Sequence, residues 1–369
     1  MFKRPRARAA VALVLGGCLA LAACGSSESN GNGNGNGNGT GSGADAGTGG
    51  DEGQQVADGS LEALIEAAEA EGQLIWYQTA EERIGQRVAD AFSEKYNIDV
   101  SFNRLNSSQM EQRFSAEMEA GAPAADVIIP LHAAFFQHAM AEGWLVPLAD
   151  ADIPDFPAAH LPEAAVLDDD GTVVISITQY GFGYNSELVS EDEAPTTWED
   201  LLDPRWDGHI LMSDPTISTV YTDLYYLVEQ EYGIDYLEQL GAEQPLIFQG
   251  AAPMGEALAA GEGHLAIPLP VEYMANLRDQ NGAPLAWTMP DVWIGAPSVI
   301  GVVNEAEHPN AARLFAHWLM SEEGLEVFTS SIGTVNPINT DEWPTELSGP
   351  ALAELSGERQ ADIYEALGF

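Results

Sequence analysis

The sequence of 369 residues contains only two lysines, and its 13 basic residues stand against 58 acidic ones. Its formal net charge is therefore −45. A protein that binds the phosphate backbone of nucleic acids needs clustered lysine and arginine side chains, and this chain does not provide them. We therefore expect no nucleic-acid partner.

Cysteine is equally scarce, since Cys18 and Cys24 are the only two. Both follow a basic start and the apolar run 9–20, which is too short to span a membrane. A basic segment followed by a short apolar one is typical of a secretory signal peptide. Its removal leaves one cysteine, so we expect no disulfide within the mature chain, whose stability would come from core packing alone.

The end of this segment, Leu21-Ala22-Ala23-Cys24, resembles the lipobox of bacterial lipoproteins. A site ending at Cys18 would leave a hydrophobic region of about nine residues, at the low end for a signal peptide. The resemblance therefore predicts a signal peptide over residues 1–23 and a lipid on Cys24. We expect the protein to be held by this lipid alone at the outer face of the cytoplasmic membrane.

Residues 25–58 have almost no large apolar side chains and consist mainly of Gly, Asn, Ser, Thr and Asp. Such a segment cannot bury a core, so residues 24–58 are predicted to form a flexible tether, with a reach on the order of 30 Å. The acidity of the mature chain fits a salt-adapted secreted protein, and equally an acidic cleft that attracts cations. Composition does not separate these two explanations.

The whole sequence is 45% hydrophobic, too much for a disordered acidic protein, and the remaining chain of about 310 residues is long enough for two domains. Its patterns alternate between strand and helix, which predicts α/β lobes with largely parallel sheets. The expected strands are 73–78, 98–102, 126–129, 210–212, 246–248, 265–267 and 296–303, with a hairpin-like stretch at 172–184. The expected helices are 61–71, 81–96, 108–120, 131–142, 219–232, 253–260, 271–280, 310–320 and 321–330.

Ligands of such sheets bind beyond the carboxyl ends of the strands. The segments 78–80, 104–108 and 130–132 follow three predicted strands and are therefore expected at the ligand site. The acidic run Asp168-Asp169-Asp170-Gly171 lacks the distal glutamate of a calcium loop and is predicted to be a hairpin turn.

Tyr184-Asn185 and the later run Pro-Thr-Thr-Trp-Glu-Asp-Leu-Leu-Asp-Pro-Arg-Trp-Asp-Gly over 195–208 resemble a signature of solute-binding proteins of bacterial ABC importers. The resemblance is to the cluster that includes ferric-iron, thiamine, polyamine and phosphonate binders, and covers nearly all of residues 60–340. It implies a two-lobed, type II periplasmic-binding-protein-like fold with a hinge near 180–185 and 290–298. We assign residues 59–182 and 296–369 to lobe 1 and residues 183–295 to lobe 2.

The same resemblance implies binding rather than catalysis, with an importer permease, its ATPase and a small solute as partners. No Gly-x-Ser-x-Gly, Gly-x4-Gly-Lys-[Ser/Thr], His-Glu-x-x-His or Gly-x-Gly-x-x-Gly motif occurs in the sequence. We expect a monomer that needs no resident cofactor.

Ferric-iron members of this family carry two adjacent tyrosines after the strand that corresponds to 265–267. Here Glu272 and Tyr273 occupy that place, and they are the candidate metal ligands for a transported Fe³⁺. Iron or an iron complex is the favoured solute. The early loop with Thr79, and His132 after the strand 126–129, are further candidates from the segments expected at the cleft.

Two other ligand classes stay open. Ser107, Ser108, Ser218 and Thr219 begin predicted helices and suit a small anion such as a phosphonate or sugar phosphate. A polyamine or thiamine-like cation would instead need an aromatic box, for which the chain offers Trp76, Tyr77, Tyr180, Tyr273 and Trp293. The expected ligand-binding residues are Thr79, Ser107, Ser108, His132, Tyr180, Ser218, Thr219, Glu272 and Tyr273.

Overall fold

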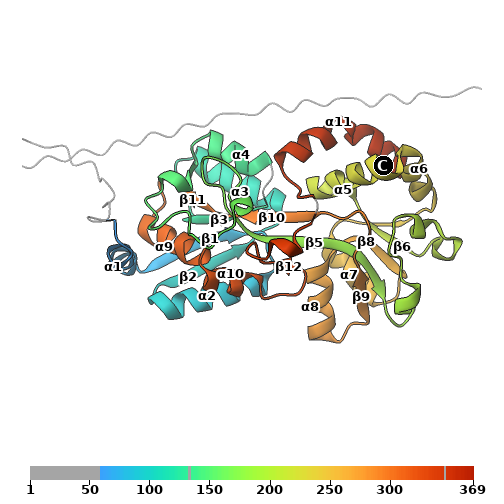
Figure 1. The fold of residues 1–369 in the computed structure, drawn as a ribbon, viewed down its shortest axis with the longest axis horizontal. Coiled ribbons are helices and arrows are strands. Elements are labelled where there is room, and N and C mark those ends of the chain that lie inside the picture. Colours follow the sequence, from blue (N-terminus) through green and yellow to red (C-terminus); the bar gives the residue numbers. More distant parts are fainter. Residues whose placement is uncertain (1–58, 132–133, 345) are drawn as a thin grey trace, which may run out of the picture. The chain divides into compact units, whose positions relative to one another are not determined.

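The computed structural model describes residues 59–131, 134–344 and 346–369. The expected signal peptide, Cys24 and the tether lie outside the described residues, and so does His132. The described chain alternates between helices and strands and builds two sheets (Figure 1). Among its helices, none is both long and apolar enough to cross a membrane.

The first sheet has five strands, of which the first three in the sheet order are parallel. Its order is β2 (Asp99–Arg104), β1 (Gln73–Gln78), β3 (Val127–Ile129), β11 (Gly301–Val303) and β4 (Leu145–Val146). β1 runs parallel to β2 and β3, whereas β11 is antiparallel to β3 and β4. The helices of this part are α1 (Leu61–Glu71), α2 (Glu82–Tyr96), α3 (Ser107–Glu119), α4 (Ala134–Ala141), α9 (Pro309–Leu319) and α10 (Glu322–Thr329).

The second sheet is built around the long strand β5. Its order is β10 (Gly295–Val299), β5 (Val174–Asn185), β8 (Leu265–Pro270), β6 (Ile210–Ser213) and β7 (Leu246–Phe248), and β9 (Leu285–Thr288) and β12 (Thr334–Val335) also pair with β5. β6 is parallel to both β7 and β8. The helices here are α5 (Thr219–Tyr232), α6 (Ile234–Ala242), α7 (Ala251–Ala259) and α8 (Val271–Asn281).

The stretch predicted to be hairpin-like is in fact one strand of 12 residues, β5. Its first half pairs with β10 and its second half with β8 and β9, so β5 links the two parts of the molecule (Figure 1). The turn predicted at 168–171 does form just before it. There the Thr172 N–H donates to Asp168 at 2.9 Å, and Val166 pairs with Val173.

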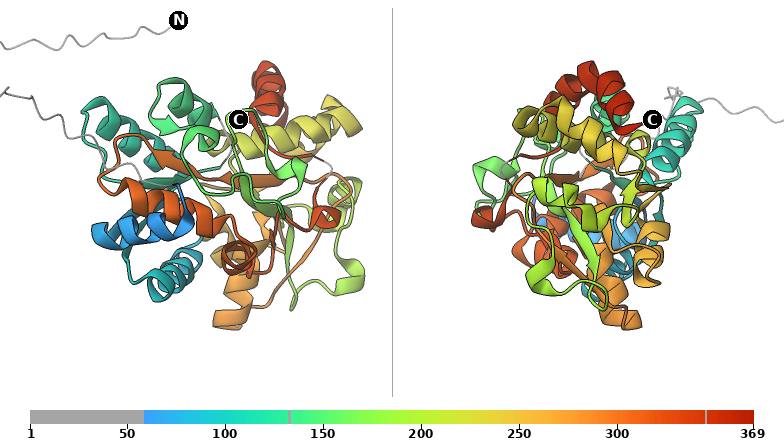
Figure 2. Two further views of the ribbon diagram at one scale, coloured as in Figure 1. Left: turned by 60° about the vertical axis from the view of Figure 1, so that its left-hand side comes forward. Right: turned by 90° about the vertical axis from the view of Figure 1, so that its right-hand side faces the viewer.

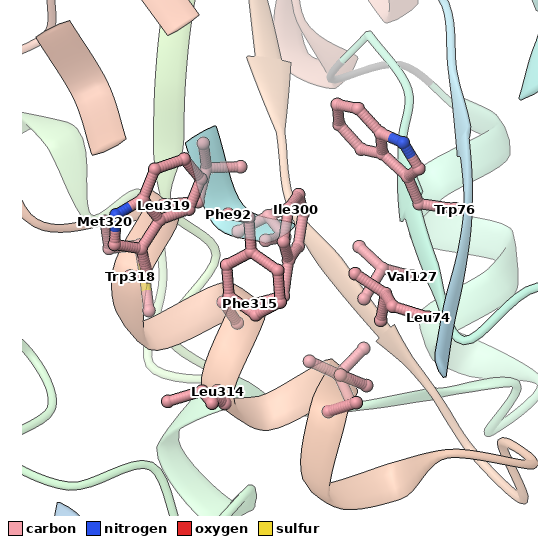
Figure 3. Packing of buried hydrophobic residues seen from close by; sticks show 14 of the residues in the cluster. Leu74, Trp76, Phe92, Val127, Ile300, Leu314, Phe315, Trp318, Leu319 and Met320 are labelled. Atoms are coloured by element: carbon pink, nitrogen blue, oxygen red, sulfur yellow. The ribbon is translucent and has the colours of Figure 1, made fainter. Parts of the chain in front are cut away.

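The first core lies where α2 and α9 meet, and Figure 3 shows its aromatic centre. The apolar residues of α2 recur at helical spacing, which brings Phe92 onto its buried face. The Phe92 ring lies 5.1 Å from that of Phe315 and 5.4 Å from that of Trp318, at angles typical of favourable aromatic pairs.

The second core contains Trp198, the tryptophan of the sequence signature. Its side chain is fully buried, its ring lies 4.9 Å from that of Phe182, and its indole N–H donates to the Val292 carbonyl at 2.7 Å. The signature therefore has a structural role, since Trp198 joins β5 to the segment that returns toward β10.

The C-terminal helix α11 (Pro350–Leu367) corrects one of our lobe boundaries. We assigned residues 296–369 to lobe 1, but α11 packs against α5 and α6, and its Leu352, Ile363 and Leu367 belong to the second core. Figures 1 and 2 show α11, in red, beside the yellow α5. This packing favours grouping α11 with lobe 2, and the lobe limits stay a prediction.

Candidate functional site

A cavity of about 840 Å³ lies at the carboxyl ends of the parallel strands of both sheets. This volume is within the range of about 300–1,000 Å³ that is common for small-molecule sites. The first sheet contributes Thr79 to Glu82, Arg104 and Asn106 to Ser108 to its lining. The second contributes Thr216 to Ser218, Gln249 to Pro253, and Pro270, Glu272 and Tyr273, while Thr178, Tyr180 and Ser298 come from β5 and β10.

Five helices begin at this cavity, because each follows a parallel strand. The residues that precede their first turns are Glu81, Asn106, Ser218, Gly250 and Pro270, and all five line the cavity. The first N–H groups of a helix have no acceptor within it, and they carry the positive end of the helix dipole. The cavity therefore receives partial positive charge from several directions.

The two helices from the first sheet already have side-chain caps. Glu81 accepts the N–H of Arg83 at the start of α2, and Asn106 forms a complete capping box with Gln109 at the start of α3. The other three helices, α5, α7 and α8, have no side-chain cap. N–H groups at these three helix starts therefore have no side-chain acceptor, and groups of this kind can bind an anion.

Arg104 is the cation of this lining. Its guanidinium forms no hydrogen bond or ion pair with any other residue of the described chain, whereas Arg113, Arg205, Arg278 and Arg359 each pair with an acid. Its positive charge opposes the rise in pKa of residues on α8, so it lies within electrostatic reach of that helix. An unpaired guanidinium beside free helix N-termini suits an anionic ligand.

Glu272 lies in the first turn of α8, where its carboxylate accepts the Thr334 hydroxyl at 3.0 Å. Gly333 has φ +85° and a Cβ there would come within 2.3 Å of the Glu272 nitrogen, so the chain at 333–334 runs directly against this turn. Burial, together with the charge of Glu81, raises the pKa of Glu272 to about 7, although Thr334 and Arg104 act in the opposite direction. Near neutral pH this carboxyl is therefore partly uncharged.

Three tyrosines share the lining, and all three resist deprotonation. The rings of Tyr180 and Tyr221 lie edge to face at 5.9 Å, and the Tyr273 hydroxyl donates to the Ala252 carbonyl at 3.4 Å. Burial raises the pKa of each of these phenols. Within residues 59–131, 134–344 and 346–369, no group of three or more His, Cys, Asp or Glu side chains is placed to hold a metal ion.

The model of the bacterial extracellular solute-binding protein family matches residues 122–348, which is more than half of the chain. The chain belongs to this family. A relative of this solute-binding protein is an uncharacterized protein from Haemophilus influenzae, 28% identical over 277 residues that cover 72% of this chain and 78% of the relative.

The fold of this solute-binding protein is similar to several solved structures. Iron-bound HitA from Pseudomonas aeruginosa has a TM-score of 0.61 at 21% identity, over 80% of this chain and 99% of HitA. AfuA from Actinobacillus pleuropneumoniae, with bound fructose-6-phosphate, has a TM-score of 0.59 at 22% identity, over 80% and 97%. The substrate binding protein of the ABC transporter from Agrobacterium tumefaciens has a TM-score of 0.67 at 16% identity, over 80% and 94%. The predicted two-lobed, type II periplasmic-binding-protein fold is thus confirmed.

Most of the residues that sequence patterns assigned to the site of this solute-binding protein come together in the cavity. These are Thr79, Ser107, Ser108, Tyr180, Ser218, Glu272 and Tyr273. Thr219 begins α5 next to Ser218, but it is exposed and does not line the cavity. Their roles in binding stay predictions, and the structure does not describe His132.

The aromatic box expected for a cationic amine does not assemble. Trp76 and Tyr77 are fully buried in the cores of the first lobe, and Trp293 does not line the cavity. Successive residues of a strand point to opposite faces of its sheet, so Trp76 and Tyr77 pack into two different clusters instead of meeting a ligand. Only Tyr180 and Tyr273 of the five reach the cavity.

Sequence patterns missed one whole segment of the lining, Gln249 to Pro253 at the start of α7. The signal was present, because this segment directly follows the predicted strand 246–248. Applying the carboxyl-end rule to that strand as well would have found it. Gly250 has φ +141°, a backbone conformation that glycine adopts readily and other residues rarely do.

Proposed function

We propose that this protein is the substrate-binding component of an ABC importer, and that it captures a small anionic solute carrying a phosphate or phosphonate group. The observation that carries the choice of solute is the meeting of three uncapped helix N-termini and an unpaired Arg104 at one cavity. The solute would pass to a membrane permease with its ATPase. Binding, and not catalysis, is the proposed activity.

The rest of the lining supports an anion with a polar body. Beside the carboxylates of Glu81, Glu82 and Glu272 it contains nine hydroxyl and amide side chains, which can bond to sugar hydroxyls as well as to phosphate oxygens. They are Thr79, Asn106, Ser107, Ser108, Thr178, Thr216, Ser218, Gln249 and Ser298. A cavity of about 840 Å³ is larger than a single phosphate group needs, and a sugar phosphate of the kind bound by AfuA is of a suitable size.

Ferric iron is the second candidate, because Glu272 and Tyr273 stand side by side on the cavity wall as two oxygen donors. HitA, which has a similar fold, was crystallised with iron. Chelation by Tyr273 must remove a proton from a phenol whose pKa burial has raised. A polyamine or thiamine-like cation has less support, since its aromatic box is not formed.

Titration calorimetry with fructose 6-phosphate, methylphosphonate, ferric citrate and spermidine tests these assignments. We expect fructose 6-phosphate to bind, and more weakly at pH 8 than at pH 6, because Glu272 with its pKa of about 7 becomes a carboxylate facing the anion. Glu272→Gln should remove this loss of affinity at pH 8. Any effect of the titration of the phosphate group would remain, so this variant serves as the control.

Ferric iron should show the opposite dependence of affinity on pH. Its binding would release the phenolic proton, so ferric affinity should rise from pH 6 to pH 8 and fall sharply in Tyr273→Phe. Tight iron binding of that kind, without binding of either phosphorus compound, would overturn the anion assignment. Compaction on binding in small-angle scattering would accompany closure of the lobes around either solute.

The lipid anchor at Cys24 is supported by the sequence alone and is part of the proposal. Cys24→Ser should release the folded protein into the medium, because the only mature cysteine would no longer carry a lipid. Fractionation of cells that express wild-type and variant protein measures this. A variant that stays in the membrane fraction would contradict lipid anchoring.

The lobe limits are also proposed. We place residues 59–182 and 296–329 in lobe 1, and residues 183–295 together with α11 in lobe 2, with the hinge in β5 and in the segment that leads into β10. We further propose that the protein acts as a monomer, as each chain carries a cavity lined from both of its own sheets.

A further inference from the structure

Tyr364 on the C-terminal helix α11 contacts the back of the cavity wall. Its hydroxyl donates to the Pro215 carbonyl at 3.1 Å. The Tyr364 hydroxyl also lies 2.8 Å from the Thr222 hydroxyl on α5 and accepts the Gln360 amide at 2.8 Å. Thr222 itself donates to the Pro215 carbonyl at 3.4 Å. Tyr364 is therefore the centre of a small polar cluster that joins α11, α5 and the segment before α5.

That segment, the short 3-10 helix Pro215–Ile217, leads directly into the lining of the cavity. Asp214 holds it from the other end, because its carboxylate accepts both the N–H and the hydroxyl of Thr216, at 2.8 and 2.6 Å. The Gln249 amide donates to the same carboxylate at 2.7 Å. Asp214 and Tyr364 thus hold the segment at two successive residues, Thr216 through its N–H and hydroxyl and Pro215 through its carbonyl.

α11 is held in place by other contacts as well. Ser348 and Ser356 donate to the two oxygens of the fully buried Asp223 on α5, at 2.6 and 2.5 Å. Arg359 forms an ion pair with Glu229 at 2.5 Å, further along α5. Because these contacts and the apolar packing of α11 do not involve the Tyr364 hydroxyl, its removal should leave the helix docked.

We propose that Tyr364 is a positioning residue for the solute. Its hydroxyl fixes the Pro215 carbonyl and, through it, the side chains of Thr216 and Ser218 and the uncapped start of α5. A helix that contributes nothing to the lining therefore sets the affinity of the cavity. This inference rests on the proposed function, since it takes the cavity to be the solute site.

The test compares Tyr364→Phe with Arg359→Gln, a change on the same helix that removes an ion pair to a part of α5 further from the cavity. With fructose 6-phosphate as the probe, Tyr364→Phe should weaken binding about three- to tenfold, the range for one lost hydrogen bond. Arg359→Gln should change it less than about twofold. Hydrogen exchange of the backbone amides of residues 216–221, without any solute, should be faster in Tyr364→Phe alone.

Equal affinity of the two variants would overturn the inference, and so would unchanged exchange at 216–221 in Tyr364→Phe. A general loosening of α11 is also recognised, because it would speed exchange of the amides within α11 in Tyr364→Phe, and this too would contradict a specific role for Tyr364. Failure of wild-type protein to bind any phosphorus compound would instead overturn the proposed function. The exchange measurement, which needs no solute, would still decide whether Tyr364 holds the segment.

Discussion

Replacing Arg104 by glutamine should weaken the binding of fructose 6-phosphate by about tenfold to hundredfold, the range for losing a hydrogen bond to a charged group. The Arg104 guanidinium has no hydrogen bond or ion pair with another described residue, so its removal leaves no hydrogen-bond partner unpaired, although its charge also acts on Glu272 and Tyr273. The loss therefore reports on the solute and not on the fold. Titration calorimetry at fixed ionic strength measures it, with thermal unfolding as the check on folding.

Arg278→Gln is the matched control for this change. Arg278 is a cation on α8, but it pairs with Asp279 and stacks on Trp287, away from the cavity lining. It should leave affinity within about twofold, as expected for an exposed ion pair. If Arg104→Gln strengthened ferric binding while leaving phosphate binding unchanged, the solute would be a cation that Arg104 repels.

Asp126→Ala should lower the free energy of unfolding by about 3–5 kcal/mol. The side chain is almost fully buried, and its oxygens accept the N–H of Ile75 at 2.8 Å and the N–H of His308 at 2.9 Å. The His308 ring nitrogen Nδ1 lies 3.0 Å away as a third partner. Alanine would leave these groups buried and unpaired at the point where β1, β3 and the start of α9 meet.

Urea unfolding followed by circular dichroism measures this loss. Asp99→Ala is a suitable control, because Asp99 begins β2 with an exposed side chain and its removal should cost less than about 0.5 kcal/mol. A loss below about 1 kcal/mol in Asp126→Ala would contradict the view that this carboxylate ties the first sheet to α9.

Local signals predicted many elements well. The helix predicted over 61–71 forms as α1, where Ser60 accepts the N–H of Ala63 and Gly72 ends the helix in the left-handed conformation. The carboxyl-end rule correctly predicted that Thr79 and Ser107 lie at the cavity. Both successes rest on rules that act over a few residues or on the general geometry of parallel sheets.

The sequence-based predictions failed where contacts between residues far apart in the chain determine the structure. α11 contains Ser356-Gly357 in its middle, a pair that disfavours helix, yet Ser356 is held there by its bond to Asp223 on α5. β5 continues as one strand because different partners support its two halves. The Arg104 guanidinium has no hydrogen-bond or ion-pair partner among the described residues because of where the nearby acids lie in the fold. No local sequence pattern predicts this.

Both halves of the molecule are assembled from separate parts of the chain. The first sheet receives β11 from residues 301–303 and its core receives α9, while the second core is completed by Leu352, Ile363 and Leu367 near the C-terminus. Contacts between such distant residues form slowly, because the entropy of closing long loops must be lost first. A chain that emerges N-terminus first therefore cannot finish either half early. We expect the second half to complete its core only after release of the C-terminal helix, and a chain cut before α11 would leave that core open.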